Sequence, residues 1–149
     1  MKFKDGNLTA KSGQRDLSGI VRDNIDELLV KIIEFTCVRN EIISNNISNC
    51  HLPGFVPKKL DDEEFATLIS YALSEHLKNN RLMLRDGECV RFFDDGAFDI
   101  NAKIDIKAVE LFRKNFPGYI SLQKKRRREN LANNRIAVAL LEQKIQKSR

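Results

Sequence analysis

Tryptophan is absent from the sequence, and histidine, cysteine and proline are scarce, with two, three and three residues among 149. The cysteines, Cys37, Cys50 and Cys89, include no C-x-x-C pair, and no histidine stands at the spacing of zinc ligands. An odd number of cysteines also argues against a disulfide framework, so three free thiols are expected. We therefore predict no metal site and no cofactor.

Long hydrophobic runs are also missing. The most apolar stretch, Leu28–Ile33, contains Lys31 and is far shorter than the roughly 20 residues that cross a membrane. Residues 1–19 are polar and lack the apolar core of about 7–15 residues that a secretory signal requires. Composition alone therefore predicts a cytoplasmic protein.

The charge is weakly positive, because 26 basic and 21 acidic residues give a formal net charge of +5. Much of the surplus lies in the run Lys124–Arg128. Five consecutive basic residues wrap around a helix instead of lining one face, which suits nonspecific contacts with nucleic-acid phosphates. The same run is also typical of the solvated side of a helix. A basic nucleic-acid-binding helical protein is therefore the alternative function, disfavoured by the small charge surplus and the lack of a helix-turn-helix pattern.

The first half of the chain predicts an arm followed by two helices. Residues 1–21 are polar and contain Gly and Ser, so we expect a flexible arm. Over residues 22–49, apolar residues recur at three- and four-residue steps, which predicts a helix roughly 40 Å long. Pro53-Gly54 ends it, and Asp61 or Asp62 is expected to cap a second helix. Residues 22–78 thus form one predicted unit: helix, turn and second helix.

Residues 79–118 predict a small mixed region that contains a hairpin. The apolar runs Leu82–Leu84 and Cys89–Phe92 flank Asp86-Gly87, a pair that favours a tight hairpin turn. A further turn leads to a third expected strand at Phe98–Ile100. Such a patch is marginal alone and must pack against helices.

The last part of the chain predicts a second long helix over residues 119–149. Before it, Asp105 is expected to cap a short helix that Pro117-Gly118 stops. Neither Gly nor Pro occurs from Tyr119 to Lys147. Four apolar residues of this stretch lie on a seven-residue frame, namely Leu131, Val138, Leu141 and Ile145.

The predicted fold is mainly α, with long N- and C-terminal helices that pair as a coiled-coil-like bundle around a small mixed α/β middle region. Helices of matched length with single apolar stripes favour such pairing. Arg39 and Asn134 interrupt the two stripes. The interruptions weaken a two-helix pair and favour burial among more helices.

A recognisable pattern follows the first helix. It reads Asn46-Ile47-Ser48-Asn49, then Pro53-Gly54-Phe55, and then a basic and acidic link over Lys58–Phe65. Asparagine at a helix end can satisfy free backbone groups and bond to neighbouring segments, and Pro-Gly sets a sharp turn. A second segment, Glu129–Ile145, begins Glu129-Asn130-Leu131-Ala132-Asn133-Asn134 and leads into an apolar helix.

In this order the two segments resemble the flagellar basal-body rod proteins, most closely the proximal-rod branch called FlgB. The family's stretch has the form N-I-A-N-x-x-T-P-G-Y, and Leu52 of this chain stands where the family has Thr. The similarity covers roughly residues 22–73 and 129–147.

The resemblance implies a structural protein that the flagellar type III pathway exports without a cleaved signal and that polymerises through its terminal helices. Its place would be the periplasmic rod of the flagellar basal body, in conflict with the cytoplasmic prediction. The implied partners are other rod subunits, in a homo-oligomeric or mixed helical assembly, with basal-body ring and export-gate proteins and no small-molecule substrate. The residues expected to carry the motif and the assembly are Asn46, Ile47, Asn49, Pro53, Gly54, Phe55, Phe65, Leu131, Asn133, Val138 and Leu141.

Two features are also compatible with catalysis. The cluster Asp61–Glu64 offers paired carboxylates, but at a helix start it more simply complements the positive end of the helix dipole. His51 has the chemistry of a base, yet no nucleophile accompanies it. We therefore predict that the protein is not an enzyme.

Overall fold

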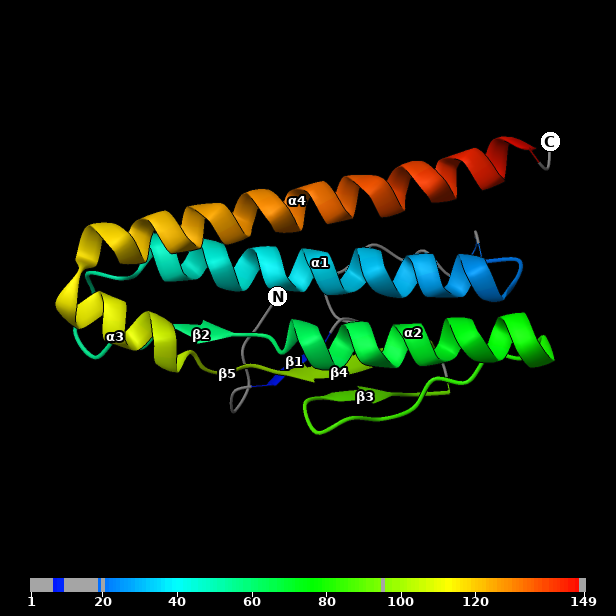
Figure 1. The fold of residues 1–149 in the computed structure, drawn as a ribbon, viewed down its shortest axis with the longest axis horizontal. Helices are drawn as coiled ribbons and strands as arrows, with labels where there is room; N and C mark the ends of the chain where they lie inside the picture. The colour runs from blue at the N-terminus through cyan, green and yellow to red at the C-terminus, as the bar shows by residue number, and fades with distance from the viewer. Residues whose placement is uncertain (1–6, 10–18, 20, 95, 148–149) are drawn as a thin grey trace.

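The computed structural model describes residues 7–9, 19, 21–94 and 96–147. Within these residues the elements are β1 (Asn7–Thr9), α1 (Asn24–Ser48), β2 (Lys58–Lys59), α2 (Asp62–Asn79), β3 (Val90–Phe92), β4 (Phe98–Asn101), β5 (Lys103–Ile104), α3 (Ile106–Lys114) and α4 (Phe116–Lys147). The mainly α class with a small mixed region is confirmed. Helices α1, α2 and α4 lie along the long axis of the molecule (Figure 1). No described helix is long and apolar enough to cross a membrane.

The helix starts follow the capping signals of the sequence. Asp23 caps α1 by accepting the Asp26 N–H at 2.9 Å. Asp61 caps α2 through the Glu64 N–H, and Asp105 caps α3 through the Ala108 N–H. A carboxylate at the N-cap satisfies an otherwise unpaired backbone donor, so local sequence is sufficient to place these boundaries.

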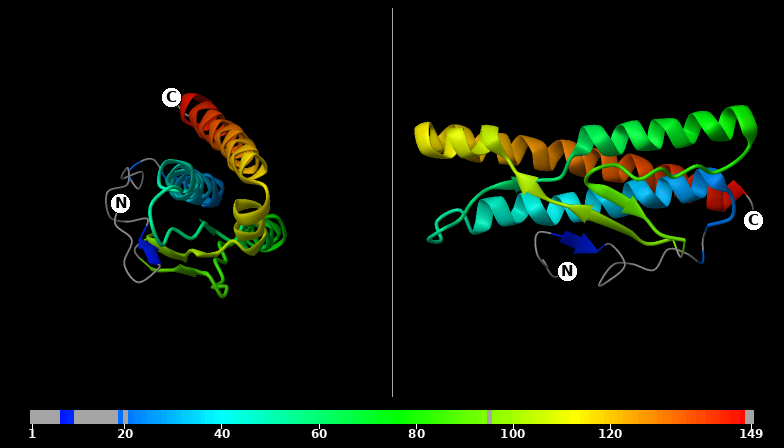
Figure 2. Two further views of the ribbon diagram at one scale, coloured as in Figure 1. Left: turned by 90° about the vertical axis from the view of Figure 1, so that its left-hand side faces the viewer. Right: turned by 90° about the horizontal axis from the view of Figure 1, so that it is seen from below.

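Helix α1 is the central element and buries two opposite sides. One side packs against the sheet and α2 in a core cluster of Phe35, Val38, Ile42, Leu60, Phe65, Val90, Phe98 and Ile100. The other side packs against α4 in a cluster of Leu29, Val30, Ile33, Ala137 and Leu141. Seen end-on, α1 lies between α4 and the sheet, with α2 at the side (Figure 2).

The sheet differs from the predicted hairpin. Strands pair antiparallel in the order β1-β4-β3, and β3 and β4 form a hairpin in which the Phe93 N–H donates to the Ala97 carbonyl at 2.9 Å. The prediction of a strand at Leu82–Leu84 is wrong, because no pairing forms there. Asp86 instead accepts the Phe92 N–H at 2.8 Å, and the Gly87 N–H donates to the Val90 carbonyl at 2.8 Å, so the chain bends at residues 88–89 and forms no hairpin there.

The expected flexible arm over residues 1–21 contains one ordered strand. Asn7 to Thr9 form β1, which pairs with Asp99 to Asn101 of β4. The rest of the arm lies outside the described residues, apart from Gly19 and Val21. A second, two-stranded sheet joins β2 to β5.

The expectation that Pro117-Gly118 stops a helix is wrong. Helix α3 ends earlier, at Lys114, and α4 begins at Phe116 and includes both residues. Proline is tolerated in a first helical turn because the N–H groups there have no intrahelical partner. The Asn115 side chain accepts the Gly118 N–H at 3.1 Å and so caps the new helix.

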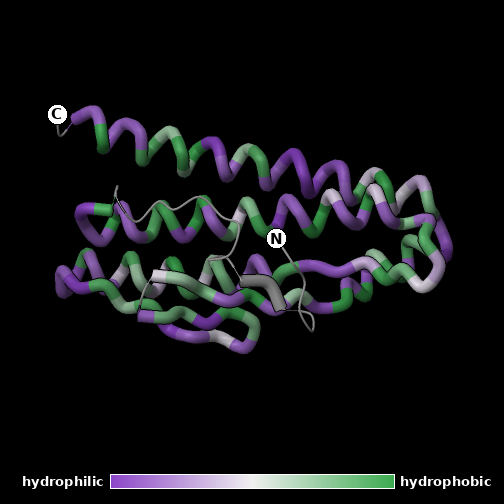
Figure 3. The backbone as a smooth tube through the Cα atoms, turned by 180° about the vertical axis from the view of Figure 1, so that it is seen from behind, coloured by the Kyte–Doolittle hydropathy of each residue, from purple (hydrophilic) through white to green (hydrophobic). Residues whose placement is uncertain are grey.

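The two terminal helices pack side by side and antiparallel, since Lys144 near the end of α4 reaches Asp23 before α1. The residues of α4 that face α1 include Gln123, Asn130 and Ala137, spaced seven apart and all buried. The predicted frame is therefore wrong for Leu131, which is 36% exposed. Hydrophilic segments interrupt the apolar ones along the whole of α4 (Figure 3).

Candidate assembly surface

Asn46 joins three elements near the end of α1. Its side-chain Nδ2 donates to the Lys58 carbonyl at 2.8 Å and to Gln123 Oε1 at 3.1 Å, and its Oδ1 accepts the Lys58 N–H at 3.2 Å. Its backbone carbonyl accepts the Tyr119 hydroxyl at 2.6 Å. Asn46 therefore fixes β2 and the first turns of α4 against α1. Burial at this contact raises the pKa of the Tyr119 hydroxyl well above its ordinary value.

The remaining motif residues of α1 are less buried. Asn49 is the C-cap, and its side-chain amide donates to the Asn45 side chain. Ile47 is half-buried. These residues end the helix locally, whereas Asn46 bonds to distant segments.

The turn after α1 projects from one end of the molecule. Gly54 has φ +76°, a conformation that glycine adopts without strain, and the exposed Pro53 precedes it. Phe55 is half-buried and packs beside Phe112 of α3, with ring centroids 6.2 Å apart. On either side, Leu52 and Val56 are 49% and 43% exposed. The turn is thus anchored by one aromatic ring and presents two apolar side chains to solvent.

Phe65 lies in the core and not on the surface. Its ring stacks on Phe35 with centroids 3.9 Å apart and an interplanar angle of 5°. Only 5% of the residue is exposed. Its part in the motif is therefore to fix α2 onto α1.

The four predicted residues of α4 divide between two sides of the helix. Leu141 is buried and Val138 half-buried, and both pack in the cluster with α1. Leu131 and Asn133 are exposed. Sequence reasoning missed Asn130, whose Nδ2 donates to the Thr36 carbonyl at 2.7 Å inside the helix pair.

An open apolar groove runs between α2 and α4, with α1 as its floor. We call it the α2–α4 groove; its volume is about 460 Å³. Leu29, Ile32 and Phe35 contribute to the floor, Leu73 to one wall, and Ile136 and Leu140 to the other. Ile136 and Leu140 are 59% and 46% exposed. The sequence contains a signal for this wall, because two apolar residues four apart lie on the same face of a helix. The sequence did not indicate that this face lines a groove.

The basic run is divided between the interior and the surface. Arg126 forms an ion pair with Asp105, which is fully buried. Lys124, Lys125 and Arg128 are exposed. The run therefore does not present five equivalent cations to solvent.

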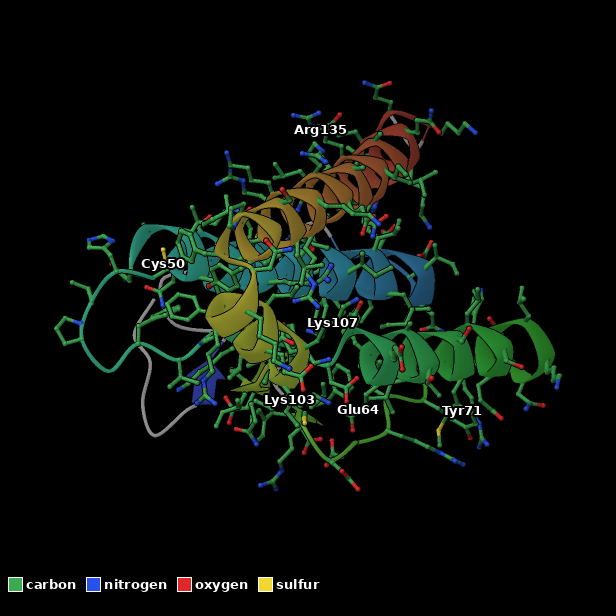
Figure 4. The ribbon with its side chains drawn as sticks, turned by 60° about the vertical axis from the view of Figure 1, so that its left-hand side comes forward. Cys50, Glu64, Tyr71, Lys103, Lys107 and Arg135 are labelled. Atoms are coloured by element: carbon green, nitrogen blue, oxygen red, sulfur yellow. The ribbon has the colours of Figure 1, made fainter. Side chains whose placement is uncertain are left out.

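One cluster in the described part of the chain has ligand atoms close enough for a metal ion, namely Asp61, Glu64 and Cys89. Asp61 accepts from Lys103 at 2.8 Å, which lowers the pKa of that carboxyl, and Glu64 accepts the Cys89 N–H at 3.0 Å. Burial, with the Glu64 charge next, raises the pKa of the Cys89 thiol. Glu64 and Lys103 lie on the same side of the molecule (Figure 4). These groups are already bonded to one another and to backbone, so they fit a structural brace that holds the 88–89 segment.

No protein-family model, curated protein or solved structure compared with this chain matches it. Its function is therefore inferred from the residues themselves: the motif turn, the polar contacts of α1 with α4, and the α2–α4 groove.

Proposed function

We propose that the protein is a structural subunit of the bacterial flagellar basal-body rod, in its proximal part. The resemblance of the Asn46–Phe55 and Glu129–Ile145 segments to rod proteins supports this proposal. In the fold, the first segment covers the end of α1 and the turn that follows α1, and the second segment lies within α4. The protein would act by its position between neighbours.

The α2–α4 groove is the observation that carries the proposal. Contiguous exposed apolar surface marks an interaction site, because its burial against a partner is favourable by about 25 cal/mol per Å². The groove is elongated along the helices and floored by apolar side chains of α1. We propose that it receives a terminal helix of a neighbouring rod subunit, of the same or a different kind, which completes a coiled-coil-like bundle.

The motif turn is the second contact of the proposed assembly. Leu52 and Val56 are exposed. The turn after α1, to which they belong, lies at the end of the molecule opposite the C-terminus of α4 (Figure 1). In an end-to-end polymer this position meets the next subunit along the rod axis. A heterologous contact of this kind extends without closing, as a rod requires.

The proposal includes the localisation and the other partners. The protein would be synthesised in the cytoplasm, exported by the flagellar type III pathway without a cleaved signal, and incorporated in the periplasmic rod. Export-gate proteins would contact the chain during export, and basal-body ring proteins would contact it in the assembled rod.

The test replaces one groove residue by a charge. Ile136→Asp places a carboxylate on the groove wall, so it should abolish swimming and remove the protein from purified basal bodies. Ala139→Asp is the matched control, because Ala139 is exposed on the same helix and does not line the groove. Both variants should keep the helical circular-dichroism spectrum of the original chain.

Two results would contradict the proposal. One is normal swimming in cells whose only copy carries Ile136→Asp. The other is normal flagellation after deletion of the gene. Equal loss of assembly in both variants would show that any added charge on α4 prevents assembly. The groove would then have no specific role in it.

A further inference from the structure

A polar cavity of about 250 Å³ lies where α1, β2 and α4 meet the first turn of α2. Its lining residues come from all four elements and are mostly charged or polar. The residues that matter for its chemistry are Arg39, Lys58, Lys59, Gln123 and Arg126. It is separate in character from the apolar α2–α4 groove, although Arg39 and Asp62 border both.

Gln123 contributes a buried donor without an acceptor. The residue is 0% exposed, and its Oε1 accepts from Asn46. Among the described residues, its Nε2 has no hydrogen-bond partner. A buried N–H group that lacks an acceptor is unfavourable, so a ligand atom that accepts from it would be stabilised.

Four half-buried cations line the cavity together with this donor, but Arg126 is already paired with the buried Asp105, which leaves the charges of Arg39, Lys58 and Lys59 for a ligand. Arg39 has one distant carboxylate contact, with Asp62 at 3.5 Å. Burial lowers the pKa of the Arg39 guanidinium, and the positive charge of Arg126 lowers it further. The negative charges of Asp62 and Glu129 raise the same pKa and so offset part of this shift. Neither Lys58 nor Lys59 forms a salt bridge within the described part of the chain.

The acidic residues at the cavity stand nearer to solvent. The Asp62 side chain is 53% exposed, and Glu63 and Glu129 are also exposed. Water screens exposed charges more strongly than half-buried ones. The interior of the cavity is therefore cationic and its rim acidic.

We propose that this cavity binds a small oxyanion of the phosphate type. A guanidinium presents several N–H donors in a plane, which suits phosphate oxygens, and the Gln123 amide supplies a neutral donor to the same ligand. The volume exceeds that of several waters at about 30 Å³ each. It lies below the roughly 300–1,000 Å³ of sites for drug-sized ligands, so a small hydrated anion fits the size. This inference does not depend on the rod function.

Binding is tested on the purified full-length chain with inorganic phosphate, at constant ionic strength maintained with sodium chloride. Phosphate should raise the melting temperature in a saturable way, because it binds the folded chain alone. It should also shift the side-chain amide resonance of Gln123 in ¹⁵N-edited spectra. Acetate as a second titrant distinguishes a preference for tetrahedral oxyanions from binding of any carboxylate.

Variants change the affinity in opposite directions. Arg39→Gln should weaken phosphate binding about tenfold, the effect of losing a charge-assisted hydrogen bond. Asp62→Asn frees Arg39 from its carboxylate and should tighten binding about threefold, a gain that misfolding cannot imitate. Lys125→Gln removes an equal charge from an exposed position outside the cavity and should change the affinity less than about twofold.

A melting temperature that responds to phosphate no more than to chloride would overturn the proposal. So would equal losses in Arg39→Gln and Lys125→Gln, because binding would then follow net charge alone. Stronger binding of acetate than of phosphate would overturn the assignment to a phosphate-type anion.

Discussion

The ion pair between Asp105 and Arg126 offers the sharpest test of the energetics of this fold. Asp105 is fully buried, caps α3 through the Ala108 N–H and pairs with Arg126 of α4. Its own N–H donates to the Pro57 carbonyl at 3.0 Å. One residue thus fixes α3, α4 and the segment before β2.

The cost of each substitution follows from these contacts. Asp105→Asn keeps a capping side chain and removes the charge, which leaves Arg126 without its partner. Loss of one member of a buried pair costs about 3–5 kcal/mol. Arg126 is 18% exposed, so water compensates in part and about 2–3 kcal/mol is expected here. Asp105→Ala also removes the cap and should cost about 1 kcal/mol more.

Urea unfolding at pH 7 measures both variants, and Arg126→Met completes a double-mutant cycle with Asp105→Asn. The double variant should recover about 1 kcal/mol or more relative to Asp105→Asn, because no unpaired charge remains. For a chain of this length, a loss of about 3 kcal/mol lowers the melting temperature by roughly 10 °C. A cost below about 0.5 kcal/mol for Asp105→Asn, or equal costs for Asn and Ala, would refute this assignment of roles.

Three further predictions test the motif, the two sides of α4 and the acid limb of stability. Asn46→Ala should cost about 2–3 kcal/mol in urea unfolding, because it leaves backbone groups of β2 unpaired near the interior; a neutral result would contradict its coupling role. Leu141→Ala should cost about 2–4 kcal/mol and Leu131→Ala under about 1 kcal/mol, because only the first is buried against α1; equal costs would contradict the observed facing of α4. The hydrogen bond from Lys103, followed by the one from the Glu64 N–H, holds the pKa of the Asp61 carboxyl below its ordinary 3.8. The stabilisation from the ionised carboxylate is therefore present above about pH 4, and it is lost as the pH falls through the pKa of Asp61 in the folded chain. Lys103→Gln should therefore make the fall in unfolding free energy between pH 7 and pH 3 smaller, by less than about 1 kcal/mol because the pair is partly exposed. The same fall in the variant and in the original chain would contradict the role of Lys103.

Features that depend on local chemistry were predictable from the sequence. The caps at Asp61 and Asp105, the end of α1 before the motif turn, and the long helix at the C-terminus are all confirmed. Each follows from the bonding of one or two residues to neighbours a few positions away. The placement of Asn46 at a helix end was predictable for the same reason, but its bonds to β2 and α4 were not.

Features that depend on distant partners were not predictable. A strand at Leu82–Leu84 was expected because the run is apolar, yet β4 pairs with β1 from the chain start and with β3. The Pro117-Gly118 pair looked like a stop, but Asn115 provides a cap that makes it a start. In the first case the local signal was real and the tertiary partners decided what it produced; in the second case a local cap, two residues before the proline, decided it.

The predicted stripe of α4 is right for Val138, Leu141 and Ile145, which pack against α1, and wrong for Leu131, for an instructive reason. A search for an apolar stripe assumes that the side turned toward the chain's own core is the apolar one. In α4 that side combines the apolar Ala137 and Leu141 with Gln123 and Asn130, whose hydrogen bonds with α1 fix the register of the pair. The apolar Ile136 and Leu140 remain exposed on the groove wall. These two exposed side chains are the part of α4 that the proposed neighbouring subunit would cover.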